Sequence, residues 1–353
     1  MGLVRFLLAV TVVCAHVVGD AMVGGQYAVQ LFFLISGYLI SYVLVEAKTY
    51  SRVRDFYINR GLRILPLYYL VAALSLLALL SRGGGSSVFH TYSEMPLTAK
   101  IIVGLTNLTL IGQDQVMFLS VTDGVLSWTG DYQSSDVPLF AGLLVPQAWT
   151  LSLELMFYLI APWILVSKSR IMVLFAVSVL LRALFVVFGF GLADPWDYRF
   201  FPTELAFFLF GAISHQFVAP KLIWARKHRA PLLSAVAVTV MSGLIVSFAH
   251  IPLPEALKFA VLFGGMALFL PLLFDFQGNN SIDNFLGQLS YPIYIWHILV
   301  VSVWMTLTSG FDFSTETDLA GILACTLGVS WIGLRLVEDP IQKIRSQFRA
   351  TGR

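Results

Sequence analysis

The chain has 353 residues, of which 58% are hydrophobic and 12% charged, and its mean hydropathy is +0.82. A soluble globular protein of this length does not carry so apolar a composition, so we exclude that class. The formal net charge of +2 gives no indication of a nucleic-acid partner. Apolar runs such as 62–80 and 171–190 last about twenty residues, the length of a membrane-crossing helix rather than of a β-barrel strand. The sequence therefore predicts an all-α, polytopic transmembrane helical bundle.

The first apolar stretch, residues 1–20, carries two ionisable side chains, Arg5 and His16. Because they are eleven positions apart, a helix places them on one face, separated by about 20° of rotation and about 16 Å along the axis. Ionisable side chains inside a span are costly, so both are candidates for chemistry. The stretch has no strongly basic leading region, and we interpret it as a retained span rather than a cleaved signal peptide.

Ten strong membrane spans are predicted along the chain. They are expected at 3–19, 27–46, 62–80, 148–166, 171–190, 203–219, 231–249, 256–275, 287–308 and 318–337. A weaker apolar stretch covers 98–118. We expect it to be re-entrant or interfacial, or to be balanced by a second half-span between residues 116 and 146.

The distribution of Lys and Arg predicts the orientation. With ten crossings and a cytoplasmic N-terminus, the basic clusters at 48–60, 168–170, 221–229 and 343–353 all face the cytoplasm, as the positive-inside rule requires. Both termini are then cytoplasmic. We divide the chain into an integral membrane domain, 1–340, and a basic amphipathic tail, 341–353, suited to an anionic leaflet.

Five motifs occur in a fixed order along the chain, the first of them being Arg5 followed eleven positions later by His16. The others are 30–38 (QLFFLISGY), 60–66 (RGLRILP), 149–158 (WTLSLELMFY), and 287–297 (GQLSYPIYIWH) with the closing 338–340 (EDP). In this order they resemble the membrane-bound acyltransferase-3 family. The chain departs from that pattern at Gln30, where many members have Asp, and at Leu155 and Met156, where many have acidic or Gln residues.

The resemblance implies a membrane O-acyltransferase of the inner (plasma) membrane. It implies transfer of an acyl group, often acetyl, from a cytoplasmic acyl-CoA such as acetyl-CoA to a hydroxyl of a cell-envelope or exported polysaccharide or of a lipid-linked sugar. The implied partners are the acyl-CoA, the glycan acceptor, the lipid bilayer and polysaccharide-assembly proteins. We expect no bound cofactor beyond the donor and no metal, since Cys14 and Cys325 indicate neither a disulfide nor a metal cluster.

Acyl transfer to a hydroxyl needs a base that takes the hydroxyl proton. His16 suits this role, because an unperturbed imidazole titrates near neutral pH. Glu154 is expected at a similar depth on the inward-running fourth span, and we predict that it orients or charges His16. The alternatives are a histidine packed against helix carbonyls and, for Glu154, an interfacial carboxylate near Trp149.

Three arginines are candidates for binding the donor. Arg60 and Arg63 lie three positions apart at the start of a span, and Arg5 lies at the same end of the bundle. Planar guanidinium groups suit the phosphate oxygens of coenzyme A. The alternative is that they are topology determinants that extend to lipid headgroups, which is the interpretation we prefer for Arg52 and Arg54.

Ser290, Tyr294 and His297 form one polar stripe on an apolar helix and are predicted to line the donor channel or to bond a neighbouring helix. Gly37 is expected to serve packing. Ser36 is not expected to carry the acyl group, because no base lies beside it at helical spacing.

On the outer loops, Arg199 is a candidate for contact with the acceptor, the alternative being a salt bridge with Asp194 or Asp197.

Two other classes of function stay open at this point. A polytopic transporter or flippase of a polysaccharide-export pathway also carries buried Arg, His and Glu, although the chain has no detectable two-half symmetry. The third class is a non-catalytic scaffold for polysaccharide assembly.

Overall fold

The computed structural model describes residues 1–19, 21–81 and 87–349. The described chain is almost entirely helical, as predicted. Its helices are α1 Gly2–Val17, α2 Gly25–Ser41, α3 Val53–Ser81, α4 Ser87–Glu94, α5 Leu97–Thr109, α6 Trp149–Ile164, α7 Lys168–Val187, α8 Phe201–Ile213, α9 Ile223–Ser247, α10 Glu255–Asn279, α11 Ser281–Leu307, α12 Thr315–Gly333 and α13 Asp339–Ser346. One antiparallel hairpin joins β1, Leu119–Thr122, to β2, Val125–Trp128.

Within the described residues, eight helical stretches are long and apolar enough to cross a membrane, and each coincides with a predicted span. The other two predicted spans, 3–19 and 148–166, correspond to the sixteen-residue helices α1 and α6. Short π-helical turns extend α2 to Glu46, α8 to Val218 and α12 to Glu338. The prediction of a polytopic helical membrane protein is therefore confirmed.

The weak stretch 98–118 forms no complete span. Its helix α5 has thirteen residues and ends at Leu110, which has a left-handed conformation with φ 65°. Thirteen residues rise about 20 Å, short of the roughly 30 Å hydrocarbon core. The predicted second half-span between residues 116 and 146 is wrong, because in the structure this segment forms 3-10 turns and the β1–β2 hairpin.

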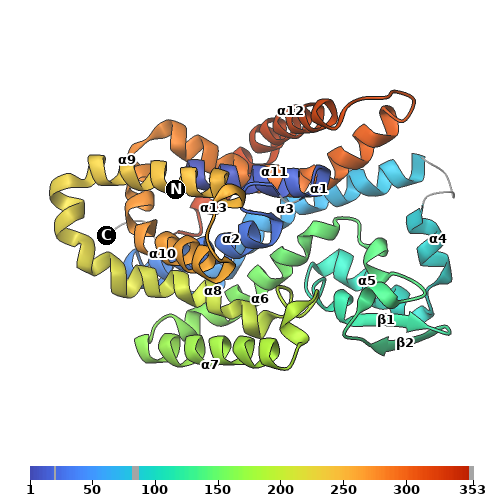
Figure 1. The fold of residues 1–353 in the computed structure, drawn as a ribbon, viewed down its shortest axis with the longest axis horizontal. Coiled ribbons are helices and arrows are strands. Elements are labelled where there is room, and N and C mark those ends of the chain that lie inside the picture. Colours follow the sequence, from blue (N-terminus) through green and yellow to red (C-terminus); the bar gives the residue numbers. More distant parts are fainter. Residues whose placement is uncertain (20, 82–86, 350–353) are drawn as a thin grey trace.

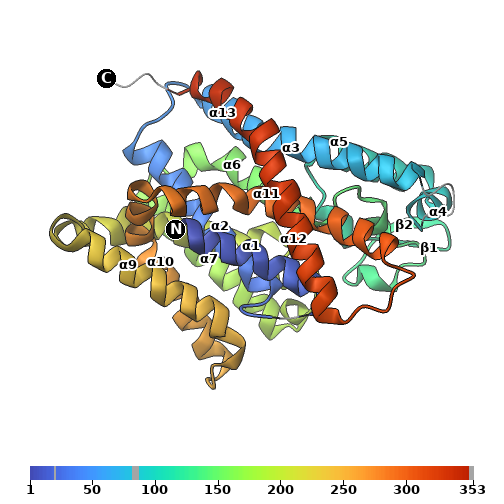
Figure 2. The same cartoon turned by 90° about the horizontal axis from the view of Figure 1, so that it is seen from above.

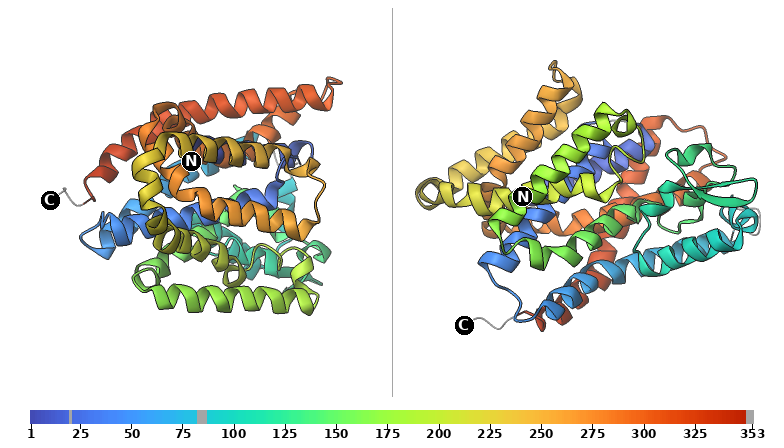
Figure 3. Two further views of the ribbon diagram at one scale, coloured as in Figure 1. Left: turned by 60° about the vertical axis from the view of Figure 1, so that its left-hand side comes forward. Right: turned by 90° about the horizontal axis from the view of Figure 1, so that it is seen from below.

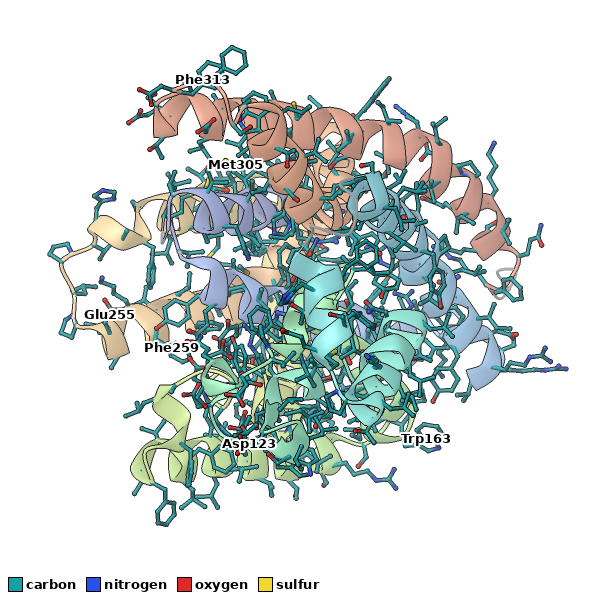
Figure 4. All side chains as sticks on the ribbon, turned by 90° about the vertical axis from the view of Figure 1, so that its right-hand side faces the viewer. Asp123, Trp163, Glu255, Phe259, Met305 and Phe313 are labelled. Atoms are coloured by element: carbon teal, nitrogen blue, oxygen red, sulfur yellow. The ribbon has the colours of Figure 1, made fainter. Side chains whose placement is uncertain are left out.

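The two ends of the bundle differ in what they carry. The N-terminus and α13 lie toward one end, at the left in Figure 1, and the hairpin lies at the opposite end. We call these the terminal end and the hairpin end. Figures 2 and 3 show α9 and α10 as an antiparallel pair on one flank, and these two helices pack on each other. Seen from the hairpin end in Figure 4, the labelled side chains of Trp163 and Phe313 lie toward the outer rim, where both are exposed.

The core is built on the contact between α2 and α8, where two glycines let the backbones touch. A Cβ added at Gly37 would lie 1.8 Å from the Phe208 carbonyl oxygen, and one added at Gly211 would lie 1.9 Å from that of Leu34. Small residues of this kind are how membrane helices approach closely. The prediction that Gly37 serves packing is therefore confirmed.

Helix α1 is held on α11 by a buried carboxylate. Asp283, near the start of α11, accepts hydrogen bonds from the backbone N–H of Gly2 at 2.7 Å and of Leu3 at 2.8 Å. A carboxylate at a helix N-terminus satisfies free N–H groups and complements the helix dipole. This cap sets the position of α1, and with it that of Arg5.

The segment predicted as a separate tail packs on the bundle as far as the structure describes it. Helix α13 begins at Asp339 and lies alongside the first turns of α3 (Figure 2), with the Arg345 side chain 5% exposed. The Asn59 side-chain amide donates to the Arg345 carbonyl at 2.9 Å. These contacts show that α13 packs on α3, while 350–353 are outside the described residues.

The glycine contact yields a stability prediction. Gly211→Ala inserts a methyl group against a backbone carbonyl that cannot rotate away, and we expect it to lower the free energy of unfolding by about 1–3 kcal/mol. The matched control is Gly243→Ala in α9, where an added Cβ meets nothing within 4 Å. Thermal unfolding of the two purified variants measures the difference. Equal melting temperatures for the two variants would contradict the close-approach argument.

Candidate functional site

A cavity of about 430 Å³ opens among α1, α2, α3, α6, α10, α11 and the end of α13. Such a volume is typical of small-molecule sites. Its polar and charged lining combines most of the predicted site residues with two basic residues from the C-terminal segment. These side chains are Arg5, Ser36, Arg60, Arg63, Thr150, Glu154, Tyr158, Gln277, Asn284, Ser290, Tyr291, Tyr294, Arg345 and Arg349.

All three arginines predicted to bind the donor line this cavity. Among the described residues, no carboxylate lies within 4.0 Å of the guanidinium of Arg5, Arg60 or Arg63, so none of the three forms an ion pair. Arg60 donates to the Tyr50 hydroxyl at 2.8 Å and stacks over the Tyr158 ring, 5.9 Å from its centroid. The three arginines thus line the cavity without a carboxylate in direct ion-pair contact.

Glu154 is the one acidic residue in the described lining of the cavity. Its Oε1 atom accepts a hydrogen bond from the Ser36 hydroxyl at 2.8 Å and another from the Tyr158 hydroxyl. A carboxylate therefore lies beside Ser36, supplied by a different helix, which helical spacing within α2 could not reveal. With five arginines and one glutamate, the cavity is strongly cationic and fits a multivalent anion.

His16 lies outside the cavity lining, at the hairpin end of α1. Its side chain is exposed, and its Nδ1 contacts the Val12 carbonyl oxygen at 2.8 Å. A carbonyl can only accept, so Nδ1 carries the proton and Nε2 is left as the basic atom. Its ring packs against that of His297, with the centroids 4.9 Å apart.

The predicted contact between Glu154 and His16 does not form in the structure. Glu154 bonds Ser36 and Tyr158, whereas His16 contacts a carbonyl of its own helix and the His297 ring. The prediction matched the depth of the two side chains, but depth does not determine which neighbours a helix face meets. Glu154 therefore belongs to the arginine cavity, and the imidazole belongs to the hairpin side.

The stripe on α11 joins these two regions. Ser290 and Tyr294 line the cavity, and the Tyr294 hydroxyl lies 2.7 Å from the Thr150 hydroxyl. His297 is fully buried beyond Tyr294, with ring centroids 5.8 Å apart, and its Nδ1 contacts the Tyr294 carbonyl at 2.6 Å. Contacts therefore run from the cavity through Tyr294 and His297 to His16.

At the hairpin end, Arg199 is engaged within the protein. It bonds Asp194 at 2.5 Å and lies over the Trp149 ring, 4.3 Å from its centroid, so the salt-bridge alternative is the one observed. Burial, reinforced by the negative charge of Asp194, raises the pKa of the neighbouring Asp197 to about 6. The side chain of Arg199 is therefore held within the protein by Asp194 and Trp149, and it does not extend freely toward an acceptor.

Two arginines of the cavity were missed by the sequence reasoning. Arg345 and Arg349 were assigned to a tail on the membrane surface, but both line the cavity. Their basic character within a short segment was the available signal, although α13 ends at Ser346 and Arg349 lies beyond the helix.

Comparison with known proteins identifies the family of the chain. The model of the acyltransferase-3 family, described as an acyltransferase domain, matches residues 1–335. The chain belongs to this family.

Among curated relatives, Nodulation protein 10 of Rhizobium leguminosarum bv. viciae is 26% identical, over 91% of this chain and 83% of the relative. Peptidoglycan O-acetyltransferase OatA of Listeria monocytogenes is 24% identical, over 96% of this chain and 55% of its own length. No solved structure matches the chain. The protein is accordingly a multi-pass membrane acyltransferase similar to O-acetyltransferases.

Proposed function

We propose that this acyltransferase moves an acetyl or other small acyl group from a cytoplasmic acyl-CoA to a hydroxyl of a cell-envelope or exported glycan, or of a lipid-linked sugar. In this proposal the protein lies in the inner membrane with the terminal end in the cytoplasm. The donor enters the arginine cavity from that side, and the acceptor approaches from the hairpin end.

The observation that carries the donor assignment is the set of guanidinium groups without carboxylate partners. Burying such groups is costly unless an anion compensates them. The nucleotide end of coenzyme A supplies several phosphates, and Arg5, Arg60 and Arg63 supply planar multi-donor groups that suit them. The thioester end would then extend toward Ser290 and Tyr294, at the far side of the cavity.

His16 is the proposed general base for the acceptor. Its Nε2 takes the proton of the acceptor hydroxyl as the oxygen attacks the thioester carbonyl carbon. The carbon–sulfur bond then breaks, and the leaving thiolate takes a proton to give the free thiol. Because Tyr294 lies between the cavity and His297, the acyl end has to pass the Tyr294 side chain to reach this base.

The decisive assay combines the purified protein, acetyl-labelled acetyl-CoA and isolated envelope glycan or lipid-linked sugar. Transfer of label to a hydroxyl supports the proposal. Movement of the sugar across proteoliposomes without acylation would instead indicate the transporter or flippase alternative.

Replacing the proposed base tests its role. His16→Ala is expected to lower kcat at least a hundredfold, since general-base catalysis contributes about 10²–10⁴ in rate. Binding of coenzyme A is expected to stay unchanged, because His16 does not line the donor cavity. Single-turnover transfer and calorimetric titration separate the two effects. Wild-type turnover in this variant would remove His16 from the mechanism.

Replacing a cavity arginine tests the donor site. Arg63→Gln removes one charge-assisted contact, worth about 1.5–3 kcal/mol, and should raise the KM for acetyl-CoA about tenfold or more. The matched control is Arg52→Gln, because Arg52 is exposed and does not line the cavity. The same donor affinity in both variants would exclude Arg63 as a donor contact.

A further inference from the structure

We propose that the C-terminal segment completes the donor site, with Arg345 and Arg349 binding phosphate groups at the nucleotide end of the acyl-CoA. This inference rests on the proposed function, in which the donor occupies the arginine cavity. It assigns a binding role to a segment beyond residue 335, where the match to the family ends.

The first support is the placement of the two guanidinium groups. Arg345 and Arg349 line the main cavity together with the donor arginines. They also line an adjoining cavity of about 220 Å³, which shares Arg5 and Arg63 with the first. Four arginines from three parts of the chain therefore line both cavities, against one carboxylate in the described lining of each, Glu154 in the first and Glu338 in the second.

The second support is the burial of Arg345 without a counter-ion. Its side chain is 5% exposed, and no carboxylate of the described residues lies within 4.0 Å of it. One of its terminal nitrogens donates to the Asn59 side-chain oxygen at 3.2 Å, while its Nε is buried with no partner. A buried guanidinium group without a counter-ion has lost its hydration and has not regained equivalent interactions. An anion bound in the cavity would supply those interactions.

The third support is a hydrogen-bond network that joins this arginine to one already assigned. The Asn59 oxygen that receives Arg345 also lies 3.4 Å from a terminal nitrogen of Arg60 and accepts from the Tyr50 hydroxyl at 3.1 Å. The Nε of Arg60 is buried and unpartnered as well. The two guanidinium groups are thus held by one amide, each with donor capacity left for a ligand.

Several guanidinium groups in one region suit a ligand with more than one phosphate. Phosphate esters reach this end of a membrane protein from two sources, nucleotides and anionic lipid headgroups. We assign the nucleotide, because these arginines share their cavity with Ser290 and Tyr294, toward which the thioester extends in the proposed function.

The test measures coenzyme A binding to the full chain in phosphatidylcholine nanodiscs by calorimetry. We expect Arg349→Gln and Arg345→Gln each to weaken binding at least tenfold. Arg349 is exposed, so its variant should fold even if Arg345→Gln does not, and melting temperatures report on both. The matched control, Lys343→Gln, removes the same charge from the same helix outside both cavities and should change binding less than twofold.

Transfer from acetyl-pantetheine, which lacks the nucleotide, separates phosphate binding from general damage. Its KM should be the same in all variants and in the wild type. Unchanged coenzyme A affinity in the Arg349 variant and in a folded Arg345 variant overturns the inference. So does an equal loss in the Lys343 variant, or a loss confined to binding of phosphatidylglycerol in nanodiscs that contain it.

The outcomes also separate this inference from the proposed function. A wild-type protein that transfers acetyl from acetyl-CoA while both arginine variants keep full affinity overturns the inference alone. A wild-type protein that binds coenzyme A but acylates no hydroxyl, with weakened binding in the variants, overturns the proposed acceptor chemistry and supports the inference. A wild-type protein that binds no coenzyme A overturns both.

Discussion

The cost of holding uncompensated guanidinium groups inside an apolar bundle is the constraint on which the site depends. Five arginines surround one cavity, and within its described lining only Glu154 opposes their charge. Hydrogen bonds that Arg60 donates to the Tyr50 hydroxyl and Arg345 donates to the Asn59 side-chain oxygen offset part of that cost, as does the contact of Arg60 with the Tyr158 ring. The remaining desolvation cost favours anion binding, because a guanidinium group with unmade hydrogen bonds in the empty protein is stabilised most when an anion binds to it.

Two tight helix contacts keep these charges in place. The Asp283 cap fixes the start of α1 on α11, and Arg5 follows one turn later. On the other side, Gly37 brings α2 against α8, while the adjacent Ser36 points to α6 and bonds Glu154. Neighbouring positions on α2 therefore have different roles. Gly37 has no side chain and lets the two helices touch, whereas Ser36 supplies a hydroxyl group to the cavity. A Cβ at Gly37 would push α8 away from α2 and change how the two helices pack.

The helical spans, the shared location of Arg5, Arg60 and Arg63 at one cavity, and the packing role of Gly37 were predictable, because hydrophobic length and 3.6-residue periodicity act locally along the chain. Contacts between helices were not. Periodicity states which face a side chain is on and at what depth, but not which helix covers that face. For this reason Glu154 was assigned to His16 when it bonds Ser36, and α13 was taken for a surface tail when Arg345 packs on Asn59. The hairpin was missed because its eight strand residues are too few to form a distinct pattern.

The separation between the arginine cavity and the imidazole pair has a chemical consequence. Tyr294, bonded to Thr150 and to the Gln147 carbonyl, stands between the two regions, and Phe32 packs on its ring. In the proposed function, a thioester held behind this layer is kept away from the exposed hairpin side, where His16 would activate water as readily as a sugar hydroxyl. The layer therefore favours transfer over hydrolysis only if Tyr294 yields when an acceptor is present. Its two hydrogen bonds are the contacts that such a movement would have to break, and each is worth only about 1 kcal/mol net.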